Sequence, residues 1–201
     1  AVVISTPVKT HFEMAMKCLD SGKNILVEKP MATTTEEISQ ISKLSTSKDL
    51  VAMVGHTFLF NSAVIYIKEL IENDKLGDIR YIYSQRLNLG RIRSDVDALW
   101  NLAPHDISII QYWLGNPDPI SINKTGMAFV QDKIDDVVFM SINYPNNILA
   151  NIHVSWLDPH KTRKMTIVGT DKMVVYDDIA DDKVTIYDKG IDPMAILGKN
   201  M

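Results

Sequence analysis

The 201-residue sequence lacks several features that would assign it at once to a class of protein. Cys18 is the only cysteine, so no disulfide can form within the chain, which fits a reducing compartment such as the cytoplasm. No apolar run approaches the roughly 18–20 residues that a transmembrane helix needs, so we expect no membrane partner. The net charge of −4 provides no general positive field, which argues against nucleic acid as a partner.

The short motifs of several enzyme classes are also missing. The chain has no Gly-x-Ser-x-Gly elbow and no phosphate-binding Gly-Lys-Ser/Thr. His56 and His153 are possible metal ligands, but no spacing of histidine, aspartate and glutamate supports a metal site. We therefore expect no metal ion. Small anionic ligands stay possible, because arginines and helix N-termini bind them whatever the net charge.

The first 57 residues alternate between short apolar runs and helical patterns. Two helices are expected: one opens at Thr6-Pro7 and closes at Gly22, and the other opens at Thr34 or Thr35. The apolar runs predict buried strands of a parallel, doubly wound α/β sheet. These runs cover residues 1–5, 25–27 and 50–54.

The pattern changes after residue 57, so we predict two domains, 1–57 and 58–201. The second is expected to be α+β with a large, mainly antiparallel sheet, and to be incomplete at its C-terminus. Its predicted helices cover 64–71 and about 97–114. Its predicted strands cover 79–89, 120–130, 136–144, 148–156, 164–168, 172–176 and 183–187.

Polar residues follow the first two strands. Ser5 and Thr6 lie where the first strand meets a helix, and open α/β sheets bind ligands at this edge, although a plain N-cap explains them equally. Lys29 follows the second strand and can donate or accept a proton if burial lowers its pKa. The alternative is a solvated loop lysine beside the rigid Pro30.

His105 is the candidate general acid or base of the second domain, because histidine titrates near neutral pH. Asn101 precedes it by four residues and could share its helix face. Pro104 complicates this, since proline is best tolerated in the first helical turn. If the helix starts at Ala103, Asn101 lies just before it. A structural histidine is the alternative.

Arginines provide candidate anion ligands. Arg86, Arg91 and Arg93 precede the His105 helix and could bind a phosphate or carboxylate, although a solvated charge cluster is equally consistent. Arg163, which follows Trp156, is a weaker candidate.

Four short motifs occur in one order along the chain: Thr6-Pro7 with His11, Glu28-Lys29-Pro30, Gly55-His56, and Asn101-x-x-x-His105-Asp106. This ordered set resembles the Gfo/Idh/MocA family of NAD(P)-dependent oxidoreductases over essentially the whole chain. The resemblance implies a Rossmann domain followed by an α/β domain with a large open sheet. That sheet commonly forms an oligomer interface in the family, so a homo-oligomer is expected.

The resemblance also implies roles for particular residues. His105 would take the hydroxyl proton of a sugar while hydride moves from its carbinol carbon to the nicotinamide of NAD or NADP, and Lys29 would orient that oxygen. The implied cofactor-binding residues are Ser5, Thr6, Pro7, His11, Glu28 and Lys29. The candidate substrate ligands are Asn101, Arg86, Arg91, Arg93, His56 and Arg163.

The chain departs from the family pattern in three places. Many members have aspartate where this chain has Asn101, and Val8 replaces a common asparagine. No Gly-x-Gly-x-x-Gly is present, and the family places it ahead of the first strand seen here. We therefore expect on the order of 60 residues to be missing in front. Without them the pyrophosphate lacks its glycine turn, so we predict that this chain alone binds NAD(P) poorly.

The residues around the arginine cluster look like the branch of the family that acts on nucleotide sugars. They are Leu87-Asn88-Leu89-Gly90, Asp97-Ala98-Leu99-Trp100 and Trp156-Leu157-Asp158-Pro159. A UDP-N-acetylhexosamine-like substrate is expected, and a plain cyclitol or aldose is the alternative. Two other hypotheses are an NAD-dependent glycosidase of the same family and a non-catalytic protein whose sheet only mediates assembly.

Overall fold

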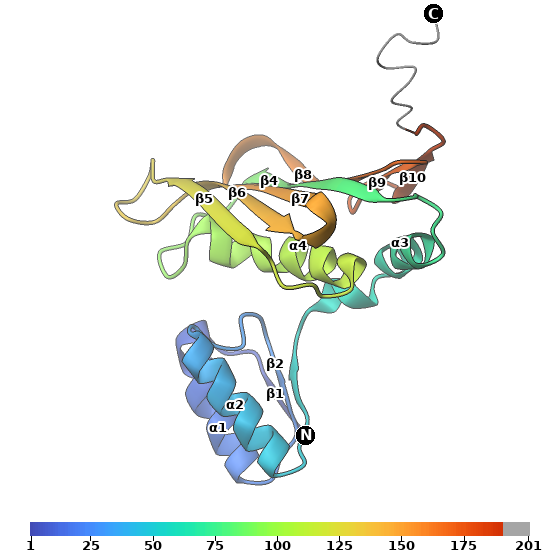
Figure 1. Ribbon diagram of the computed structural model, residues 1–201. Helices are drawn as coiled ribbons and strands as arrows, with labels where there is room; N and C mark the ends of the chain where they lie inside the picture. Colours follow the sequence, from blue (N-terminus) through green and yellow to red (C-terminus); the bar gives the residue numbers. More distant parts are fainter. Residues whose placement is uncertain (191–201) are drawn as a thin grey trace, which may run out of the picture. The chain divides into compact units, whose positions relative to one another are not determined.

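The computed structural model describes residues 1–190, which form two compact units that meet in sequence between Thr57 and Phe58 (Figure 1). Unit 1 comprises residues 1–57, and unit 2 begins at Phe58. Unit 1 is a parallel sheet with two helices, and unit 2 is a large mixed sheet with two helices. The α/β fold class predicted from the sequence is confirmed.

Unit 1 is built on a three-stranded parallel sheet in the order β1-β2-β3. The strands are β1 (Val2–Ile4), β2 (Ile25–Val27) and β3 (Ala52–Val54), and the helices are α1 (His11–Asp20) and α2 (Thr35–Ser47). The apolar side chains of the helices pack on those of the strands, and this core includes Ile4, Leu19, Val27 and Ile41. The alternation read from the sequence is therefore confirmed.

The start of α1 differs from the prediction. A 3₁₀ turn, η1 (Val8–Thr10), follows Pro7, and the α-helix begins only at His11. The predicted helix start at Thr6-Pro7 was therefore wrong by about one turn, since the Thr6 hydroxyl bonds the Thr10 hydroxyl at 2.7 Å instead of capping α1. Gly22 closes α1 as predicted, with φ of +70°.

The predicted cap of α2 is confirmed. Thr34 is the N-cap, and its hydroxyl accepts a hydrogen bond from the Glu37 backbone N–H at 3.2 Å. The Glu37 carboxylate in turn accepts a hydrogen bond from the Thr33 backbone N–H at 2.8 Å. These reciprocal bonds satisfy donors that a helix N-terminus leaves open.

Unit 2 has a seven-stranded sheet in the order β10-β9-β8-β4-β7-β6-β5. All neighbours are antiparallel except β4 and β7. Its helices are α3 (Ser62–Glu72) and α4 (Ala98–Leu114), and η2 (Thr57–Phe60) precedes α3. Its strands are β4 (Ile79–Leu89), β5 (Ser121–Met127), β6 (Val137–Tyr144), β7 (Ile148–Ser155), β8 (Leu157–Gly169), β9 (Met173–Asp177) and β10 (Val184–Tyr187), and η3 (Pro145–Asn147) joins β6 to β7.

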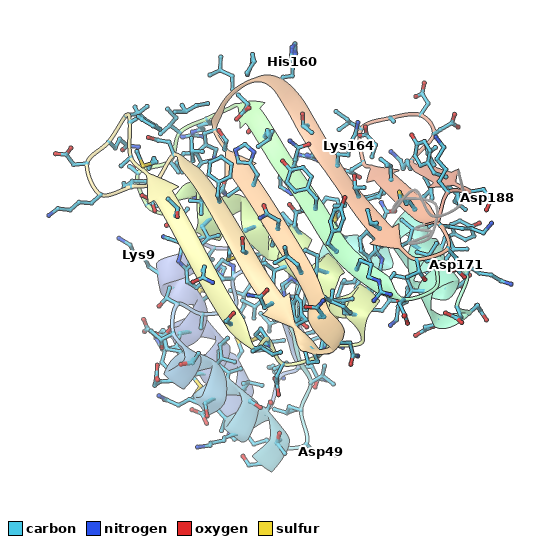
Figure 2. All side chains as sticks on the ribbon, turned by 45° about the horizontal axis from the view of Figure 1, so that its top comes forward. Lys9, Asp49, His160, Lys164, Asp171 and Asp188 are labelled. Carbon is cyan, nitrogen blue, oxygen red and sulfur yellow. The ribbon has the colours of Figure 1, made fainter. Side chains whose placement is uncertain are left out.

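Both helices of unit 2 lie on one side of this sheet (Figure 1). The α4 helix packs on β4, β6 and β7, and α3 packs on α4 and β9. Buried side chains of the strands alternate along the chain, as in Ile82, Ser84 and Arg86 of β4. The opposite side, which we call the open face, carries side chains that neither helix covers (Figure 2).

The β8 strand is much longer than predicted. The sequence indicated a strand only over 164–168, whereas β8 runs from Leu157 to Gly169. The polar run from Asp158 to Arg163 concealed its first half. The strand β4 pairs with both ends of this run, since Arg86 and Leu87 pair with Arg163 and Thr162, and Leu89 pairs with Leu157. Trp156 was predicted to be the last residue of a strand over 148–156, but it lies between β7 and β8 and belongs to neither.

The α4 helix resolves the uncertainty about Pro104. The helix begins at Ala98, and the Asp97 carboxylate caps it by accepting a hydrogen bond from the Trp100 N–H at 2.8 Å. Pro104 therefore lies inside the helix, not at its start. Asn101 and His105 both belong to α4, one turn apart, so they can share a helix face.

Two negative findings concern residues 1–190. No helix in this range is long and apolar enough to cross a membrane. No group of three or more histidine, cysteine, aspartate or glutamate side chains within it could hold a metal ion.

Candidate functional site

The carboxyl ends of the three parallel strands of unit 1 carry the predicted polar residues. The Glu28 N–H donates to the Ile4 carbonyl at 2.8 Å, and the Gly55 N–H donates to the Val27 carbonyl at 2.8 Å. These bonds bring the segments after β1, β2 and β3 together at one edge. An open parallel sheet binds ligands at this edge.

His11 joins two of these segments. It is 1% exposed, and its ring nitrogens lie 2.8 Å from the Pro30 carbonyl oxygen and 2.7 Å from the Thr6 carbonyl oxygen. Both nitrogens are thus engaged with the backbone of the chain itself. In this arrangement His11 shapes the edge by holding the loop after β1 to the loop after β2.

Lys29 and His56 lie near one another at the same edge. Lys29 is half-buried, and the peptide bond between Lys29 and Pro30 is cis. Burial lowers the pKa of His56, and the nearby Lys29 ammonium lowers it further. A neutral imidazole beside a lysine ammonium can accept a hydrogen bond, so this edge offers one cation and one neutral polar group.

The glycine-rich turn of a dinucleotide site is absent from this chain. The parallel edge with Thr6, Lys29 and His56 fits the part of an NAD(P) site away from the pyrophosphate. The pyrophosphate itself needs a glycine turn and a helix N-terminus that these residues do not supply. Unit 1 therefore fits part of a dinucleotide site.

In unit 2, a pocket of about 410 Å³ lies beside the first turns of α4. Asn101 lines it, and its side-chain oxygen accepts a hydrogen bond from the Trp156 indole N–H at 3.3 Å. This contact fixes the amide of Asn101 from a strand end that is 55 residues away in sequence. The full lining is Asn88, Arg91, Ile92, Arg93, Ser94, Asp95, Asn101, Leu102 and Trp156.

Two of the predicted arginines reach this pocket. Arg91 is exposed, and Arg93 forms a bidentate pair with Asp95, with distances of 2.8 and 2.6 Å. The hydrogen bonds to Asp95 raise the pKa of Arg93. Both partners are about 40% exposed, at 43% and 40%, so water competes strongly with the pair. An anionic ligand can therefore exchange with Asp95.

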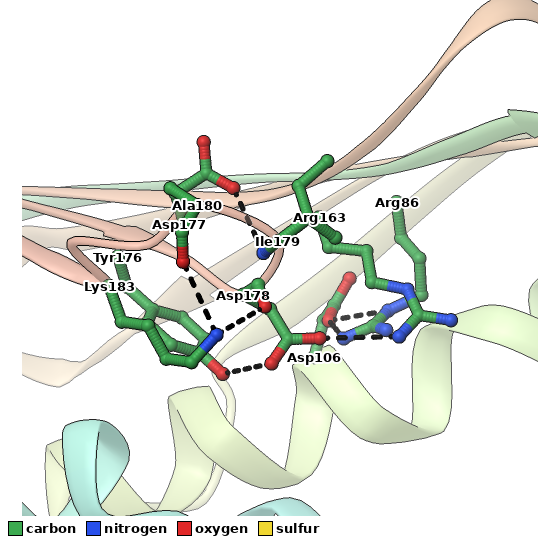
Figure 3. Close-up of polar contacts among 9 residues, drawn as sticks. All are labelled: Arg86, Asp106, Arg163, Tyr176, Asp177, Asp178, Ile179, Ala180 and Lys183. Carbon is green, nitrogen blue, oxygen red and sulfur yellow. Dashed lines mark hydrogen bonds and ion pairs between the residues drawn. The ribbon is translucent and has the colours of Figure 1, made fainter.

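Arg86, the third arginine of the predicted cluster, is placed elsewhere. It is 6% exposed and donates two hydrogen bonds to the Asp106 carboxylate, at 2.9 and 2.6 Å (Figure 3). The Ser84 hydroxyl donates to the same carboxylate at 2.8 Å. Sequence reasoning did not identify Asp106 and Ser84 as belonging to one buried cluster with Arg86. The signal was present, because alternation along β4 puts Arg86 on the same face as the apolar Ile82, where a charge needs a partner.

Arg163 also pairs within the protein. Its guanidinium lies 3.2 Å from the Asp178 carboxylate, which accepts a hydrogen bond from the Tyr176 hydroxyl at 3.0 Å (Figure 3). Burial raises the pKa of Tyr176, and Asp178 raises it further. Tyr176 is therefore a neutral donor over the physiological range.

His105 lies on α4, where its ring meets the ring of Phe58 edge to face. The ring centres are 5.0 Å apart and the ring planes are inclined at 62°. The predicted pairing of His105 with Lys29 joins residues of two different units, and it stays a prediction.

Comparison with known proteins identifies the relatives of both units. Residues 1–56 match the family described as "Oxidoreductase family, NAD-binding Rossmann fold", and residues 64–175 match the "GFO/IDH/MocA C-terminal domain". The chain belongs to the Gfo/Idh/MocA family of oxidoreductases. The resemblance read from the ordered motifs is confirmed, and unit 1 is part of an NAD-binding Rossmann domain.

Two relatives and one solved structure give the range of similarity. UDP-N-acetylglucosamine 3-dehydrogenase of Acidithiobacillus ferrooxidans is 30% identical over 192 residues, which are 94% of this chain and 59% of the relative. Its crystal structure aligns with a TM-score of 0.83 at 27% identity and covers 95% of this chain and 63% of its own. The NADP⁺-dependent scyllo-inositol 2-dehydrogenase IolW of Bacillus subtilis is 28% identical over 134 residues, 61% of this chain and 37% of the relative. The chain thus spans less than two thirds of these proteins.

Proposed function

We propose that the protein that carries this chain is an NAD(P)-dependent oxidoreductase acting on a sugar or nucleotide sugar. The observation that carries this proposal is the pocket beside α4, which is lined by Arg91, Arg93 and Asn101, the last of which precedes His105 by one helical turn. A polar concave site of this size accommodates part of a hydrophilic ligand of sugar size. The relatives named above oxidise a nucleotide sugar and a cyclitol, which supports this substrate class.

The proposed chemistry assigns one role to each unit. His105 would take the proton of the substrate hydroxyl, and the carbon that bears this hydroxyl would lose hydride to the bound cofactor, so that a ketone would form. Lys29 holds the substrate oxygen by charge and hydrogen bonding. The cofactor supplies the hydride acceptor when bound, and the chain supplies position and the proton acceptor.

We propose a nucleotide sugar as the substrate because of the guanidinium groups at the pocket. Arg91 is exposed at the lining, and Arg93 is held only by an exposed partner, Asp95. Guanidinium forks match the oxygens of a diphosphate. A free sugar offers these groups no negative charge.

The test compares two substrates in the natural protein. The Arg91→Ala/Arg93→Ala double variant should raise KM for a UDP-sugar at least about tenfold and leave KM for the matching free sugar nearly unchanged. The matched control is Arg80→Ala, an exposed arginine at the other end of β4 that bonds Asp78. Equal effects on both substrates would exclude the diphosphate role.

The reaction type has its own test. Oxidation with net transfer of hydride makes the absorbance of NADH rise in proportion to product. Product formed without that absorbance would contradict a dehydrogenase and support the NAD-dependent glycosidase hypothesis. Absence of product from any sugar substrate would support the non-catalytic alternative.

Cofactor binding by residues 1–201 alone is expected to be weak. Unit 1 supplies the edge after β1, β2 and β3 but no glycine turn for the pyrophosphate. Titration of this chain with NADH, followed by cofactor fluorescence, should show no saturation at micromolar concentrations. Micromolar affinity would show that the turn is dispensable.

We also propose that the open face of the unit 2 sheet joins two copies of the chain. Phe139 stacks on His153 there, with ring centres 4.1 Å apart, and Tyr81 lies beside Leu149 across the β4–β7 pair. Phe139 and Tyr81 are 49% and 45% exposed. Analytical ultracentrifugation of the natural protein should show a dimer or larger oligomer that Phe139→Lys weakens. A monomer at micromolar concentration would exclude this assembly.

A further inference from the structure

The α4 helix is tied to β4 at the residue that directly follows His105. The Asp106 carboxylate accepts three hydrogen bonds from β4, two from Arg86 and one from Ser84, at 2.9, 2.6 and 2.8 Å. Asp106 is 1% exposed and Arg86 is 6% exposed, so the pair is shielded from water. Charge-assisted bonds in such surroundings are short and strongly directional.

The planar guanidinium group of Arg86 also lies over the ring of Phe58. The guanidinium carbon lies 4.9 Å from the centre of the Phe58 ring, and Phe58 in turn contacts the His105 ring at 5.0 Å. Asp106 contacts Arg86, Arg86 contacts Phe58, and Phe58 contacts His105. Because Asp106 directly follows His105 in the chain, these contacts form a closed ring. We call the residues His105, Asp106, Arg86 and Phe58 the His105 circuit.

Packing alone does not require this arrangement. Apolar side chains of similar volume would join α4 to β4 without the cost of removing two charges from water. Here two guanidinium nitrogens of Arg86 bond Oδ1 of Asp106, and the Ser84 hydroxyl bonds Oδ2. An ion pair held in this way adds two things that apolar packing does not. It fixes the rotation of the helix about its own axis, and its opposite charges cancel next to the histidine.

We propose that Asp106, Arg86 and Phe58 are positioning residues that fix the direction of the His105 ring and keep its surroundings electrically neutral. The inference rests on the proposed function, in which His105 accepts the substrate proton. A proton acceptor works at the distance and angle of a hydrogen bond, so a rotation of the ring costs rate even when the fold persists.

The other ionisable side chains around the circuit form their own contacts. Arg163 bonds Asp178, which also accepts from Tyr176, and Lys68 of α3 bonds the Trp113 carbonyl and Glu72. The elements packed against α4 are α3, β4, β6 and β7, and their ionisable side chains include Lys68, Arg86 and Tyr144. Tyr176 of β9 also meets α4, since its ring centre lies 6.3 Å from that of Trp113. Of these, only Arg86 belongs to the His105 circuit. The experiment therefore removes the negative charge that compensates the Arg86 guanidinium.

The experiment measures the titration of His105 directly. Histidine-labelled natural protein is titrated by NMR, and the His105 signal is assigned from its loss in His105→Asn. Asp106→Asn keeps the shape of the side chain but leaves the Arg86 charge uncancelled, so the titration midpoint of His105 should move to lower pH. Arg86→Met/Asp106→Leu removes both charges, and the midpoint should return towards its original value.

A matched control removes the same charge from the other face of the sheet. Asp177 pairs with Lys164 at 3.2 Å, and Asp177→Asn should leave the His105 midpoint in place.

If Asp106→Asn does not fold, Phe58→Leu tests the circuit with the ion pair intact. It should shift the His105 ring signal and lower kcat at least about tenfold, with KM for the cofactor unchanged. An unmoved midpoint in folded Asp106→Asn, or an unmoved ring signal in Phe58→Leu, would overturn the proposal.

The design separates this inference from the proposed function. The NMR midpoint needs neither substrate nor cofactor, so it reports on the circuit even in a protein without activity. A moved midpoint in a protein that oxidises no sugar would support the circuit and reject the function. Full activity in Phe58→Leu, with His105→Asn inactive, would support the function and reject the circuit.

Discussion

Among the arginine–aspartate pairs of unit 2, two have similarly short hydrogen bonds but lie in opposite surroundings. Arg86 donates to Asp106 at 2.9 and 2.6 Å, and Arg93 donates to Asp95 at 2.8 and 2.6 Å. The side chains of the first pair are 7% and 2% exposed, whereas those of the second are 43% and 40% exposed. The bond lengths do not distinguish the two pairs, but burial does. The buried pair contributes to the stability of the fold, whereas the exposed pair can exchange its partner for a ligand.

The largest expected effect is on the buried pair. Asp106→Ala leaves the Arg86 guanidinium buried without its carboxylate, so the free energy of unfolding should fall by about 3–5 kcal/mol. Urea unfolding of the natural protein followed by circular dichroism measures this change. Arg86→Met/Asp106→Leu should recover most of the loss. If Asp106→Ala loses less than about 1 kcal/mol, the two pairs do not differ as burial predicts.

A smaller loss is expected when only the hydroxyl donor is removed. Ser84→Ala leaves one oxygen of the buried Asp106 carboxylate without that donor, which should cost about 1–3 kcal/mol in the same unfolding assay. Ser141→Ala is the control, because Ser141 lies on β6, separated from β4 by β7, and accepts from Asn151 at 3.0 Å in a part-buried site. Equal losses in the two variants would argue against a special role for Ser84.

A third prediction concerns His153, a partly buried histidine on the open face of the sheet. Burial lowers the pKa of His153 below 6.5, and Asp158 opposes this in part. The folded pKa is thus below the unfolded one, so stability is full above about pH 6.5 and falls as the pH drops through that value. His153→Gln should lose less stability than the unchanged protein between about pH 7.5 and pH 5. Parallel curves would contradict the burial of the neutral ring.

The exposed pair should respond least. Asp95→Ala should change the free energy of unfolding by only about 0–1 kcal/mol, because solvent screens both side chains. The same change releases Arg93 from its partner, so KM for a nucleotide sugar should fall or stay the same. A rise in KM would show that Asp95 itself contacts the substrate.

Much of the fold was predictable because local patterns agree with the tertiary result. Short apolar runs gave β1, β2 and β3, and alternation gave β4 over the same residues, Ile79–Leu89. The first half of β8 was missed, since its polar residues become a strand only by pairing with β4. The start of α1 was misplaced because the Thr6 hydroxyl bonds Thr10 instead of the helix end.

The candidate site was predictable in part. Asn101, Arg91 and Arg93 line one pocket, as their closeness in sequence suggested. Arg86 belongs to the same sequence cluster but lies within β4, where it is buried against Asp106, whereas Arg91 and Arg93 follow the end of that strand. Closeness in sequence does not reveal this difference, because the strand ends at Leu89 and only Arg86 has a side-chain direction set by it.

The sequence by itself determined the family, the order of the elements and the residues available for chemistry, because these follow from motif order and hydrophobic period. Only the tertiary structure decided which aspartate Arg86 meets, and that Phe58 connects this pair to His105. The physical reason is that burial and partnership are properties of segments that meet in space. Phe58, Arg86 and Asp106 come from three separate elements, and no local pattern encodes their contact.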